Sequence, residues 1–374
     1  MRNDRLQKLQ TLLSKKRLPA LFVTSPQNVT YLSGFHGLCS TDVLVPCLTD
    51  PEVVLLVTPR ATYTIADPRY PKQVISKIVR SDKKTNHVVI EKNIFETVSR
   101  LCKRLHIKKL GVEYGALRAT DLHKLQKVLL QIKTIDTSTL IPELRKEKDT
   151  AEIAALTKAC RATDAAFTAL LRFIRPGMAE GAIAYFLVDF FHRHSNGPAF
   201  APIVASGKSA AIPHYTTDKT KKIKKGEMLL LDFGAQVGGY HADMSRTIFV
   251  GNATPRFKTI YNLVRDAQEK TIAALQSGMH GKTADAIART TLAEAGYKKE
   301  FSHGTGHGVG LQIHEAPNLS PFSKDTLKTN HVFTVEPGLY FPSWGGVRIE
   351  DTILLTQKGP RILTRSSKKL IEIF

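Results

Sequence analysis

The sequence predicts two consecutive domains, an α/β domain over residues 1–145 and an α+β domain over residues 146–374. The chain has 374 residues, more than the roughly 100–200 residues of one typical domain. In the first part, short β-rich runs alternate with segments whose apolar residues recur every three or four positions, which is typical of an α/β domain. In the second part, helical stretches and strand pairs that meet at glycine-rich turns indicate an α+β domain.

The first domain is expected to open with a helix. Leu6, Leu9, Leu12 and Leu13 lie at helical spacing in a basic segment that lacks the continuous apolar stretch of a signal peptide. The segment contains Asp4 and leads directly into a strand-like run, so we interpret it as part of the fold rather than as a targeting peptide. After it, we expect β-rich runs at residues 18–24, 52–58, 72–79 and 108–114, and helices at residues 93–105 and 119–132.

The second domain is expected to begin with a long amphipathic helix from Leu144 to about Phe173, which Pro176-Gly177 would end. The domain boundary therefore falls near Arg145. Further helices are predicted at about residues 180–195 and 255–277, and the remainder is expected to form strand pairs.

The composition is that of a globular protein with an unusually basic charge. Hydrophobic residues make up 42% and charged residues 23%, which excludes wholesale disorder, and no apolar run approaches the ~18–20 residues needed to cross a bilayer. The net charge of +21 is compatible with an anionic partner. However, the strongest basic run, residues 219–225, has no arginine-rich or aromatic-interleaved pattern, so we interpret it as a solvated turn and expect neither a nucleic acid nor a membrane partner.

The cysteines predict a reducing environment. Cys39, Cys47, Cys102 and Cys160 form no CxxC pair and have no zinc-finger spacing. We therefore expect reduced cysteines and a cytoplasmic location.

A first pair of carboxylates lies in the segment LLLDFGAQVGGYHADMSRTIFV. Gly238-Gly239 is a hairpin signal, and folding there would place Asp232 and Asp243 on neighbouring strands. A carboxylate within an apolar strand needs a partner, because burying it alone carries a large desolvation cost. That partner is either a cation or, for each Asp taken singly, a turn or an arginine such as Arg246.

A second pair, Glu336 and Glu350, stands symmetrically about Ser343, with Trp344-Gly345-Gly346 as the expected turn of a second hairpin. Glu350 also lies in an otherwise apolar strand. Four carboxylates that converge on buried strands would repel one another unless divalent metal neutralised them.

Between the two pairs lies HGTGHGVGLQIHEAP, which contains His303, His307 and His314. A lone histidine is often structural, but beside four strand-borne acids one imidazole can ligate a transition metal while the others contact substrate. A carboxylate-rich set of this kind suits two divalent ions that activate a shared water, which implies hydrolysis. Oxygen ligands favour manganese, with cobalt, iron or zinc as alternative occupants.

The motifs DFGA, ADMSRT, HGTGHGVG, IHEAP, VEPGLY and GVRIED, in that order, resemble those of the pita-bread metallopeptidases. The resemblance is to the branch of this family that contains aminopeptidase P, prolidase and creatinase. The motifs span roughly residues 200–355. Residues 144–167 also resemble the helix that opens this family's catalytic domain. The resemblance implies a creatinase-like N-terminal domain over residues 1–145 and a pita-bread catalytic domain over residues 146–374.

Carried onto this chain, the resemblance assigns roles to individual residues. It implies that two divalent ions per subunit share Asp243 and Glu350, and that Glu336 also accepts the proton of the attacking water. His314 would stabilise the tetrahedral intermediate, and His214 and His303 would line the substrate site. Tyr340 and Arg348 resemble residues that orient the acids, and Arg348 would share a strand face with Glu350. The implied metal ligands are Asp232, Asp243, His307, Glu336 and Glu350.

The resemblance implies hydrolysis of the bond between an N-terminal residue and proline, an imide bond that lacks an N–H and resists ordinary peptidases. Some prolidases place an arginine shortly after the HE.P motif, where this chain has Asn318. The sequence therefore favours an Xaa-Pro aminopeptidase, with an Xaa-Pro dipeptidase as the alternative. The resemblance also suggests a homodimer.

Three other proteins of this fold are less consistent with the sequence. Creatinase works without metals, and methionine aminopeptidase usually lacks an α/β N-terminal domain. A catalytically silent pita-bread protein that binds nucleic acid or another anionic partner would have lost metal ligands, whereas all five are present here.

Overall fold

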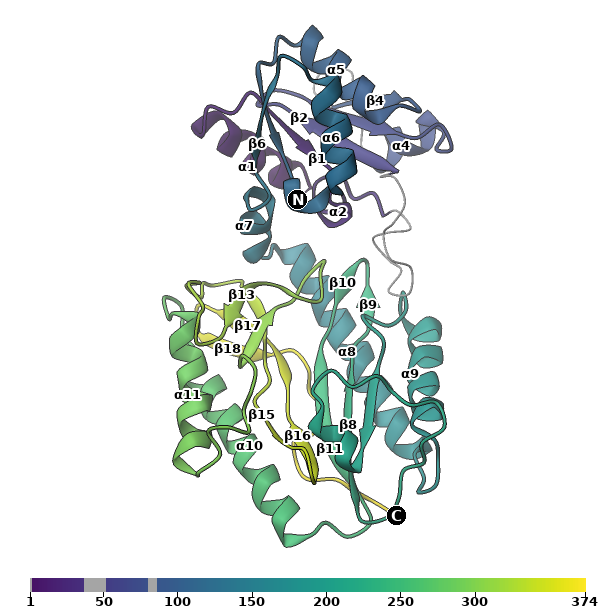
Figure 1. The fold of residues 1–374 in the computed structure, drawn as a ribbon, viewed down its shortest axis with the longest axis vertical. Helices are drawn as coiled ribbons and strands as arrows, with labels where there is room; N and C mark the ends of the chain where they lie inside the picture. The colour runs from purple at the N-terminus through teal and green to yellow at the C-terminus, as the bar shows by residue number, and fades with distance from the viewer. Residues whose placement is uncertain (1, 37–51, 80–85) are drawn as a thin grey trace. The chain divides into compact units, whose positions relative to one another are not determined.

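The computed structural model describes residues 2–36, 52–79 and 86–374, and the chain divides into two compact units, residues 1–145 and 146–374 (Figure 1). Cys39 and Cys47, two of the four cysteines expected to be reduced, lie outside the described residues. Cys102 and Cys160 are free and buried. No helix in the described ranges has both the length and the apolar character needed to cross a membrane.

The first unit is built on a mixed sheet whose described strands run in the order β4-β3-β2-β1-β5-β6. The central strand β1 pairs antiparallel with β2 and parallel with β5. The strands are β1 (Ala20–Val23), β2 (Val53–Val57), β3 (Thr62–Ala66), β4 (Asn86–Ile90), β5 (Lys109–Val112) and β6 (Lys133–Asp136). The helices are α1 (Arg2–Lys15), α2 (Pro26–Ser33), α4 (Lys72–Ile78), α5 (Ile94–Arg104), α6 (Ala119–Val128) and α7 (Leu140–Lys146), which ends just past the boundary. The α/β class predicted for this unit is confirmed.

The strand expected at residues 72–79 was wrong, because this segment is helix α4. Pro71 precedes the helix with a φ of −57°, close to the helical value. Val74, Ile75 and Ile78 follow helical spacing, and the helix buries Ile75 alone among its residues. Its β-branched composition therefore misled the prediction, whereas the apolar spacing was the better guide.

Four long helices shape the second unit: α8 (Thr150–Phe173), α9 (Glu180–His194), α10 (Pro255–Ala274) and α11 (Gly281–Glu294). The expected single helix from Leu144 to Phe173 was wrong, since α7 ends at Lys146 and α8 begins at Thr150. Asp149 interrupts the helix with extended backbone (φ −79°, ψ 174°) and forms a capping box with Glu152. Helix α11 was not predicted, because its buried face consists largely of small residues such as Ala284 and Ala288.

Two main sheets carry the strand pairs of the second unit. The first has the order β19-β11-β8-β7 and the second the order β13-β12-β14-β17-β18. Figure 1 shows α8 and α9 on one side of the strands and α10 and α11 on the other. The strands of the two sheets are β7 (Ile203–Ser206), β8 (Glu227–Phe233), β11 (Met244–Val250), β12 (Gly306–Gly308), β13 (Glu315–Leu319), β14 (Val332–Val335), β17 (Asp351–Thr356), β18 (Gly359–Ile362) and β19 (Glu372–Ile373).

The helices cover both faces of the first sheet. Leu229 and Leu231 of β8 pack in the cluster formed with α8 and α9, whereas Leu230 packs in the cluster formed with α10. Burial on both faces explains why this strand is continuously apolar rather than alternating. Asp232, near the end of the same strand, is only partly buried and lines a pocket.

The first predicted hairpin is present. Strand β8 pairs antiparallel with β11, and Asp232 lies opposite Ser245. Between them, β9 (Gln236–Val237) and β10 (Tyr240–His241) form a small ladder around the glycine turn. Asp243 directly precedes β11, so both aspartates lie at the same end of the pair.

The second hairpin is also present, but its turn differs from the expected one. Strands β15 (Gly338–Phe341) and β16 (Gly345–Arg348) pair, and residues 342–344 form the turn. Gly345 and Gly346 belong to β16 and are needed for packing: a Cβ on Gly346 would lie 2.2 Å from the carbonyl oxygen of Ala210. The glycines therefore mark a close backbone approach, which the sequence could not distinguish from a turn.

Candidate metal centre

The predicted ligands come together in one pocket of the second unit. Asp243, His307 and Glu350 can each offer a ligand atom, and these atoms lie within 4.8 Å of one another. His307 Nε2 lies 3.5 Å from Asp243 Oδ2 and 3.3 Å from Glu336 Oε1. Asp232 lines the same pocket, whose volume is about 360 Å³. The structure thus brings all five side chains together.

Breaks in the strand pairing position the two glutamates. Glu336 lies between β14 and β15, and Glu350 lies between β16 and β17, rather than within a continuous strand as predicted for Glu350. At these breaks the backbone N–H of Glu336 donates to the carbonyl of Thr305 (2.8 Å), and that of Glu350 donates to the carbonyl of Ser245 (3.1 Å). At each break, the backbone of a predicted ligand therefore bonds to a neighbouring strand or loop instead of to its hairpin partner.

Asp243, Glu336 and Glu350 stand in an environment that disfavours their charged forms. Burial, followed by repulsion from Glu350 and Asp232, raises the pKa of Asp243 well above its usual range. Burial also raises the pKa of Glu350, with the charges of Glu336 and Asp232 adding to the effect. The pKa of Glu336 is raised as well, again chiefly by burial. A divalent cation would offset this repulsion.

Two carboxylate oxygens of the site have no hydrogen-bond partner among the described residues and could contact such a cation. Asp232 Oδ2 accepts a hydrogen bond from Arg348 Nη2 (2.6 Å), and Glu350 Oε2 accepts one from Ser245 Oγ (2.8 Å). The other oxygens, Asp232 Oδ1 and Glu350 Oε1, are buried without a hydrogen-bond partner in the described part of the chain. Buried oxygens of this kind require a partner, and together with an imidazole nitrogen they form a donor set suited to divalent metal.

His307 presents the nitrogen that a metal requires. Its Nδ1 lies 3.1 Å from the carbonyl oxygen of Gly308, which can only accept, so Nδ1 carries the proton and Nε2 offers its lone pair. Burial lowers the pKa of His307 and so favours this neutral form. A Cβ on Gly306 would lie 2.0 Å from the carbonyl oxygen of Thr334, so the glycine allows the close strand approach that places His307.

Arg348 organises a chain of side chains beside the ligands. Besides Asp232, it donates to Ser245 Oγ (2.7 Å) and to the hydroxyl of Tyr340 (2.9 Å). His303 Nδ1 lies 2.8 Å from the carbonyl of Gly304 and donates to it, so His303 Nε2 accepts from the Tyr340 hydroxyl at 2.8 Å. Arg348 is thereby connected to both a predicted ligand and a predicted substrate residue.

The three histidines expected at the substrate site line the same pocket as the acids. The ring of His314 lies 4.3 Å from that of His307, centroid to centroid. Burial lowers the pKa of His303 and of His314, which favours neutral rings that can donate or accept hydrogen bonds. Each predicted substrate residue thus lines the same pocket as the predicted metal ligands.

The sequence did not point to two polar residues of the site. Ser245 bridges Arg348 and Glu350, and Thr334 Oγ1 donates to Glu336 Oε1 (3.0 Å). Ser245 could have been found from the hairpin register, which places it opposite Asp232. The apolar residues of the pocket carried no such signal; they are Phe200, Ile203, Pro213 and Ile313.

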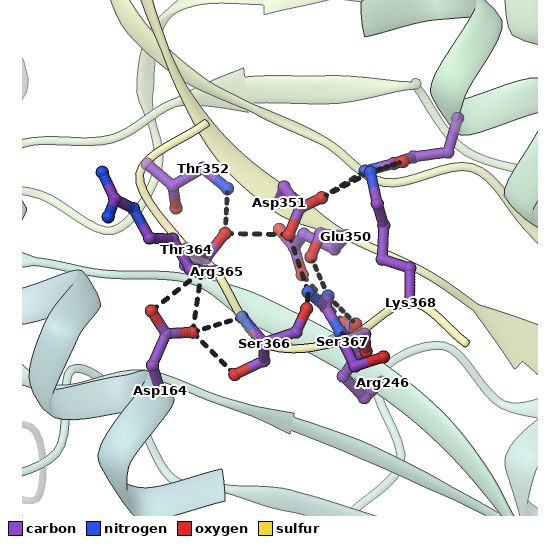
Figure 2. A network of polar contacts seen from close by, with 12 residues as sticks. Asp164, Arg246, Glu350, Asp351, Thr352, Thr364, Arg365, Ser366, Ser367 and Lys368 are labelled. Atoms are coloured by element: carbon purple, nitrogen blue, oxygen red, sulfur yellow. Dashed lines mark hydrogen bonds and ion pairs between the residues drawn. The ribbon is translucent and has the colours of Figure 1, made fainter. Parts of the chain in front are cut away.

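Arg246 does not pair with either aspartate of the site, as one interpretation of the sequence allowed. Its Nη2 lies 2.8 Å from Asp351 Oδ1, and its guanidinium also donates to the carbonyl oxygen of Glu350 (Figure 2). The same guanidinium donates to the carbonyls of Ser366 (2.7 Å) and Ser367 (3.1 Å). Arg246 therefore supports the backbone behind the site. The arginine that pairs with Asp232 is Arg348, which contacts Oδ2 and leaves Oδ1 without a hydrogen-bond partner among the described residues.

Both halves of the chain match known protein families. Residues 154–357 match the model described as metallopeptidase family M24. Residues 5–146 match the creatinase/prolidase N-terminal domain.

Individual relatives are similar over nearly the whole length. A protein of Pyrococcus horikoshii named Xaa-Pro dipeptidase is 33% identical, with 99% of each chain covered. The solved structure of an Xaa-Pro dipeptidase from Bacillus anthracis has a TM-score of 0.91 at 34% identity and covers 100% of both chains. The structure of an X-Pro aminopeptidase from Thermotoga maritima has a TM-score of 0.83 at 28% identity, covering 96% of this chain and 100% of the other.

Proposed function

Because the chain belongs to metallopeptidase family M24, we propose that it hydrolyses the bond between an N-terminal residue and a following proline. The observation that carries the proposal is the convergence of four acids and four histidines on one pocket. The names of full-length relatives, both Xaa-Pro dipeptidase and X-Pro aminopeptidase, support proline-containing peptides as substrates. In this proposal residues 1–145 are the creatinase-like domain and residues 146–374 the pita-bread catalytic domain.

The site is proposed to hold two divalent ions, with manganese as the first candidate and cobalt, zinc or iron as alternatives. Asp243 and Glu350 would contact both ions, Asp232 would complete one, and His307 and Glu336 the other. The bound ions would supply Lewis-acid activation of the scissile carbonyl and of a water. The oxygen-rich donor set supports manganese over softer metals.

The chain's own residues would perform the proton transfers and position the substrate. Glu336 is the proposed proton acceptor, since burial raises its pKa and Thr334 orients its carboxylate. His314 would stabilise the tetrahedral intermediate, and His303 and His214 would bind substrate. Arg348 would hold Asp232 in place. Tyr340, which accepts from Arg348 and donates to His303, would help to orient the His303 ring.

Whether the protein cleaves Xaa-Pro dipeptides or longer peptides is a separate question. Among the described residues that line the pocket, Arg348 alone carries a permanent positive charge, and its Nη2 already contacts Asp232 Oδ2. Asn318 lines the pocket without offering a cation for a dipeptide's carboxylate, which supports the aminopeptidase. The relatives named Xaa-Pro dipeptidase support the alternative at least equally.

One comparison tests both levels of the proposal. An Xaa-Pro dipeptide and the matching Xaa-Pro-Xaa tripeptide are each incubated with the purified protein before and after a chelator, and again with Mn²⁺ restored. We expect cleavage that the chelator abolishes and Mn²⁺ restores. Preference for the tripeptide identifies an aminopeptidase and cleavage of the dipeptide alone identifies a prolidase, while no cleavage of either would refute the proposed function.

A homodimer and a cytoplasmic location complete the proposal. The dimer rests on the family resemblance, and light scattering of the purified protein would measure it. The location rests on the cysteines, of which Cys102 and Cys160 are free. Because all five predicted metal ligands are present and line one pocket, we set aside the catalytically silent alternative and its nucleic-acid partner.

A further inference from the structure

The loop between β7 and β8 carries a substrate residue at an exposed position. Strand β7 ends at Ser206 and β8 begins at Glu227, and between them Pro213 and His214 line the pocket. His214 itself is exposed, so burial does little to fix its side chain. Its position therefore depends on how the backbone of the loop is anchored.

A buried carboxylate makes several of the contacts that anchor this loop. Glu180, at the start of α9, is 0% exposed and lies outside the set of pocket-lining residues. Its Oε1 accepts hydrogen bonds from the backbone N–H (2.8 Å) and the hydroxyl (2.7 Å) of Ser206, where the loop begins. Its Oε2 accepts from the hydroxyl of Tyr215 (3.1 Å) and, more weakly, from the backbone N–H of Asp218 (3.4 Å). One side chain thus joins the start of the loop to its middle.

Lys221 closes the same network from the far side of the loop. Its Nζ lies 3.0 Å from Glu180 Oε1 and donates to the carbonyl of Ser206 (2.6 Å) and to Ser209 Oγ (2.8 Å). The backbone N–H of Glu180 in turn donates to the carbonyl of Lys221 (2.8 Å). The buried charge of Glu180 is therefore paired, and loop and helix are fastened through both side chain and backbone.

The anchoring reaches the immediate neighbours of His214. Tyr215, which follows it, donates to Glu180, whereas the carbonyl of Pro213, which precedes it, lies 3.5 Å from Arg348 Nη1. His214 is thereby held between a contact to the helix and a contact to the metal centre. Loss of the Glu180 contacts would loosen the side of the loop that Arg348 does not reach, where Thr217 and Lys221 provide other contacts.

We propose that Glu180 is a positioning residue for substrate binding, which acts by holding the loop of residues 207–222 so that His214 faces the pocket. The inference rests on the proposed function, since it takes His214 as a substrate contact. A contact made equally in the ground state and the transition state changes KM rather than kcat. Glu180 is therefore expected to govern KM while metal binding is unaffected.

The first test compares Glu180→Gln with Glu152→Gln, using a substrate that the wild-type protein cleaves. Glu152 is also buried, at 2% exposure, but accepts from Tyr240 and from the backbone of Asp149, neither of which lines the pocket. We expect Glu180→Gln to raise KM about tenfold with kcat within about twofold, and Glu152→Gln to leave both unchanged. Tyr215→Phe, which removes one hydrogen bond and no charge, is expected to raise KM by a smaller factor and covers the case in which Glu180→Gln does not fold.

The second test asks whether Glu180 acts through His214. In a His214→Ala background, Glu180→Gln is expected to add nothing to KM, because the side chain that it positions is gone. The same rise in KM with and without His214, or no rise in either folded variant, would overturn the inference. Hydrogen exchange over residues 207–222, expected to be faster in Glu180→Gln alone, gives a reading that needs no activity, and unchanged exchange would also overturn it. A wild-type protein that cleaves no Xaa-Pro substrate would count against the proposed function instead.

Discussion

His331 is a buried histidine of the catalytic unit that is held in its neutral form. It is 3% exposed, and its Nδ1 accepts a hydrogen bond from the backbone N–H of Lys328 (3.2 Å). Burial, assisted by the charges of Lys148, Lys146 and Lys328, lowers its pKa to about 4. Since an unfolded histidine titrates near 6.5, the unfolded chain binds a proton between these values that the folded protein does not bind.

We therefore predict that His331 makes the catalytic unit less stable as the pH falls below about 6.5. The unfolded state binds more protons in this range, so the free energy of unfolding decreases with acidity, and the contribution of His331 is about 2 kcal/mol between pH 7 and pH 5. Thermal unfolding of His331→Gln at both pH values is the measurement, and the variant should lose less stability than the wild type. Exposed His123→Gln is the control. An identical pH dependence in His331→Gln and the wild type would contradict the prediction.

At the residue scale, the sequence indicated which acidic residues are candidate ligands, but not which residues contact them. Asp232 and Glu350 could be recognised as candidate ligands because a carboxylate in an apolar run requires a partner. Their supporting residues could not, since Ser245 and Thr334 are ordinary strand residues whose importance depends on what lies beside them in the folded sheets. The location of Glu336 and Glu350 at breaks in pairing likewise arises from contacts between hairpins, which a local pattern does not encode.

At the element scale, β11, β17 and an irregular segment near the C-terminus are joined by one buried ion pair (Figure 2). Arg246 and Asp351 are each 1% exposed, and Asp351 also accepts from Gln268 (2.9 Å) and Thr364 (2.9 Å). Burial opposes ionisation of Asp351, but Arg246 and Lys368 prevail and lower its pKa below the usual range. Without the pair, Asp351 would keep Lys368, at 3.1 Å, as its only cationic partner among the described residues.

We predict that Arg246→Met lowers the free energy of unfolding by about 3–5 kcal/mol, because it leaves Asp351 buried with a single cationic partner. Chemical denaturation of the catalytic unit measures the loss. Arg193→Met is the control: its ion pair with Asp189 is exposed, so less than about 1 kcal/mol is expected. If both variants lost the same free energy of unfolding, burial of the Arg246–Asp351 pair would not increase its contribution to stability.

The elements themselves were predicted where apolar spacing or capping was clear. Helices α5, α9 and α10 lie close to their expected ranges, since long apolar periodicity is a strong signal. Strands β3, β4 and β6 were missed, because edge and near-edge strands such as KTID carry few apolar residues. Their place in the sheet is decided by pairing with distant strands, which no local window contains.

At the scale of the whole molecule, the described residues of the two units form separate cores, and the candidate metal centre lies in the second unit. The core of residues 1–145 is built around β1, β2 and β5, whereas those of residues 146–374 surround the two main sheets. Separate cores favour separate unfolding transitions. A ligand that binds only the folded catalytic unit stabilises that unit alone.

Calorimetry of the metal-loaded and chelator-treated protein should therefore show two transitions, of which only one moves. Metal at a concentration of 100 times its dissociation constant adds about 2.7 kcal/mol to the stability of the catalytic unit. Asp243→Asn, which removes a proposed ligand, should abolish the shift and leave the other transition in place. If metal moved both transitions equally in the wild type, the stabilisation would not be confined to the second unit.

The fold class of both units followed from the sequence, since the alternation of strands and helices and the motif order are properties of the whole chain. The net charge of +21 did not indicate function in the same way. It includes Arg246 and Arg348, which neutralise internal acids, so total charge is a poor measure of what the surface offers to a partner.

The contact between Arg246 and the backbone of Glu350 also sets an order of events during synthesis. The two residues are 104 positions apart, and Arg246 is 120 positions from the carbonyl of Ser366. At about 5–20 residues per second, a ribosome releases the aspartates of the first hairpin roughly 5–20 s before the last glutamate. The complete set of proposed ligands therefore exists only after translation has passed Glu350, so binding of metal to the whole set would follow synthesis of most of the domain.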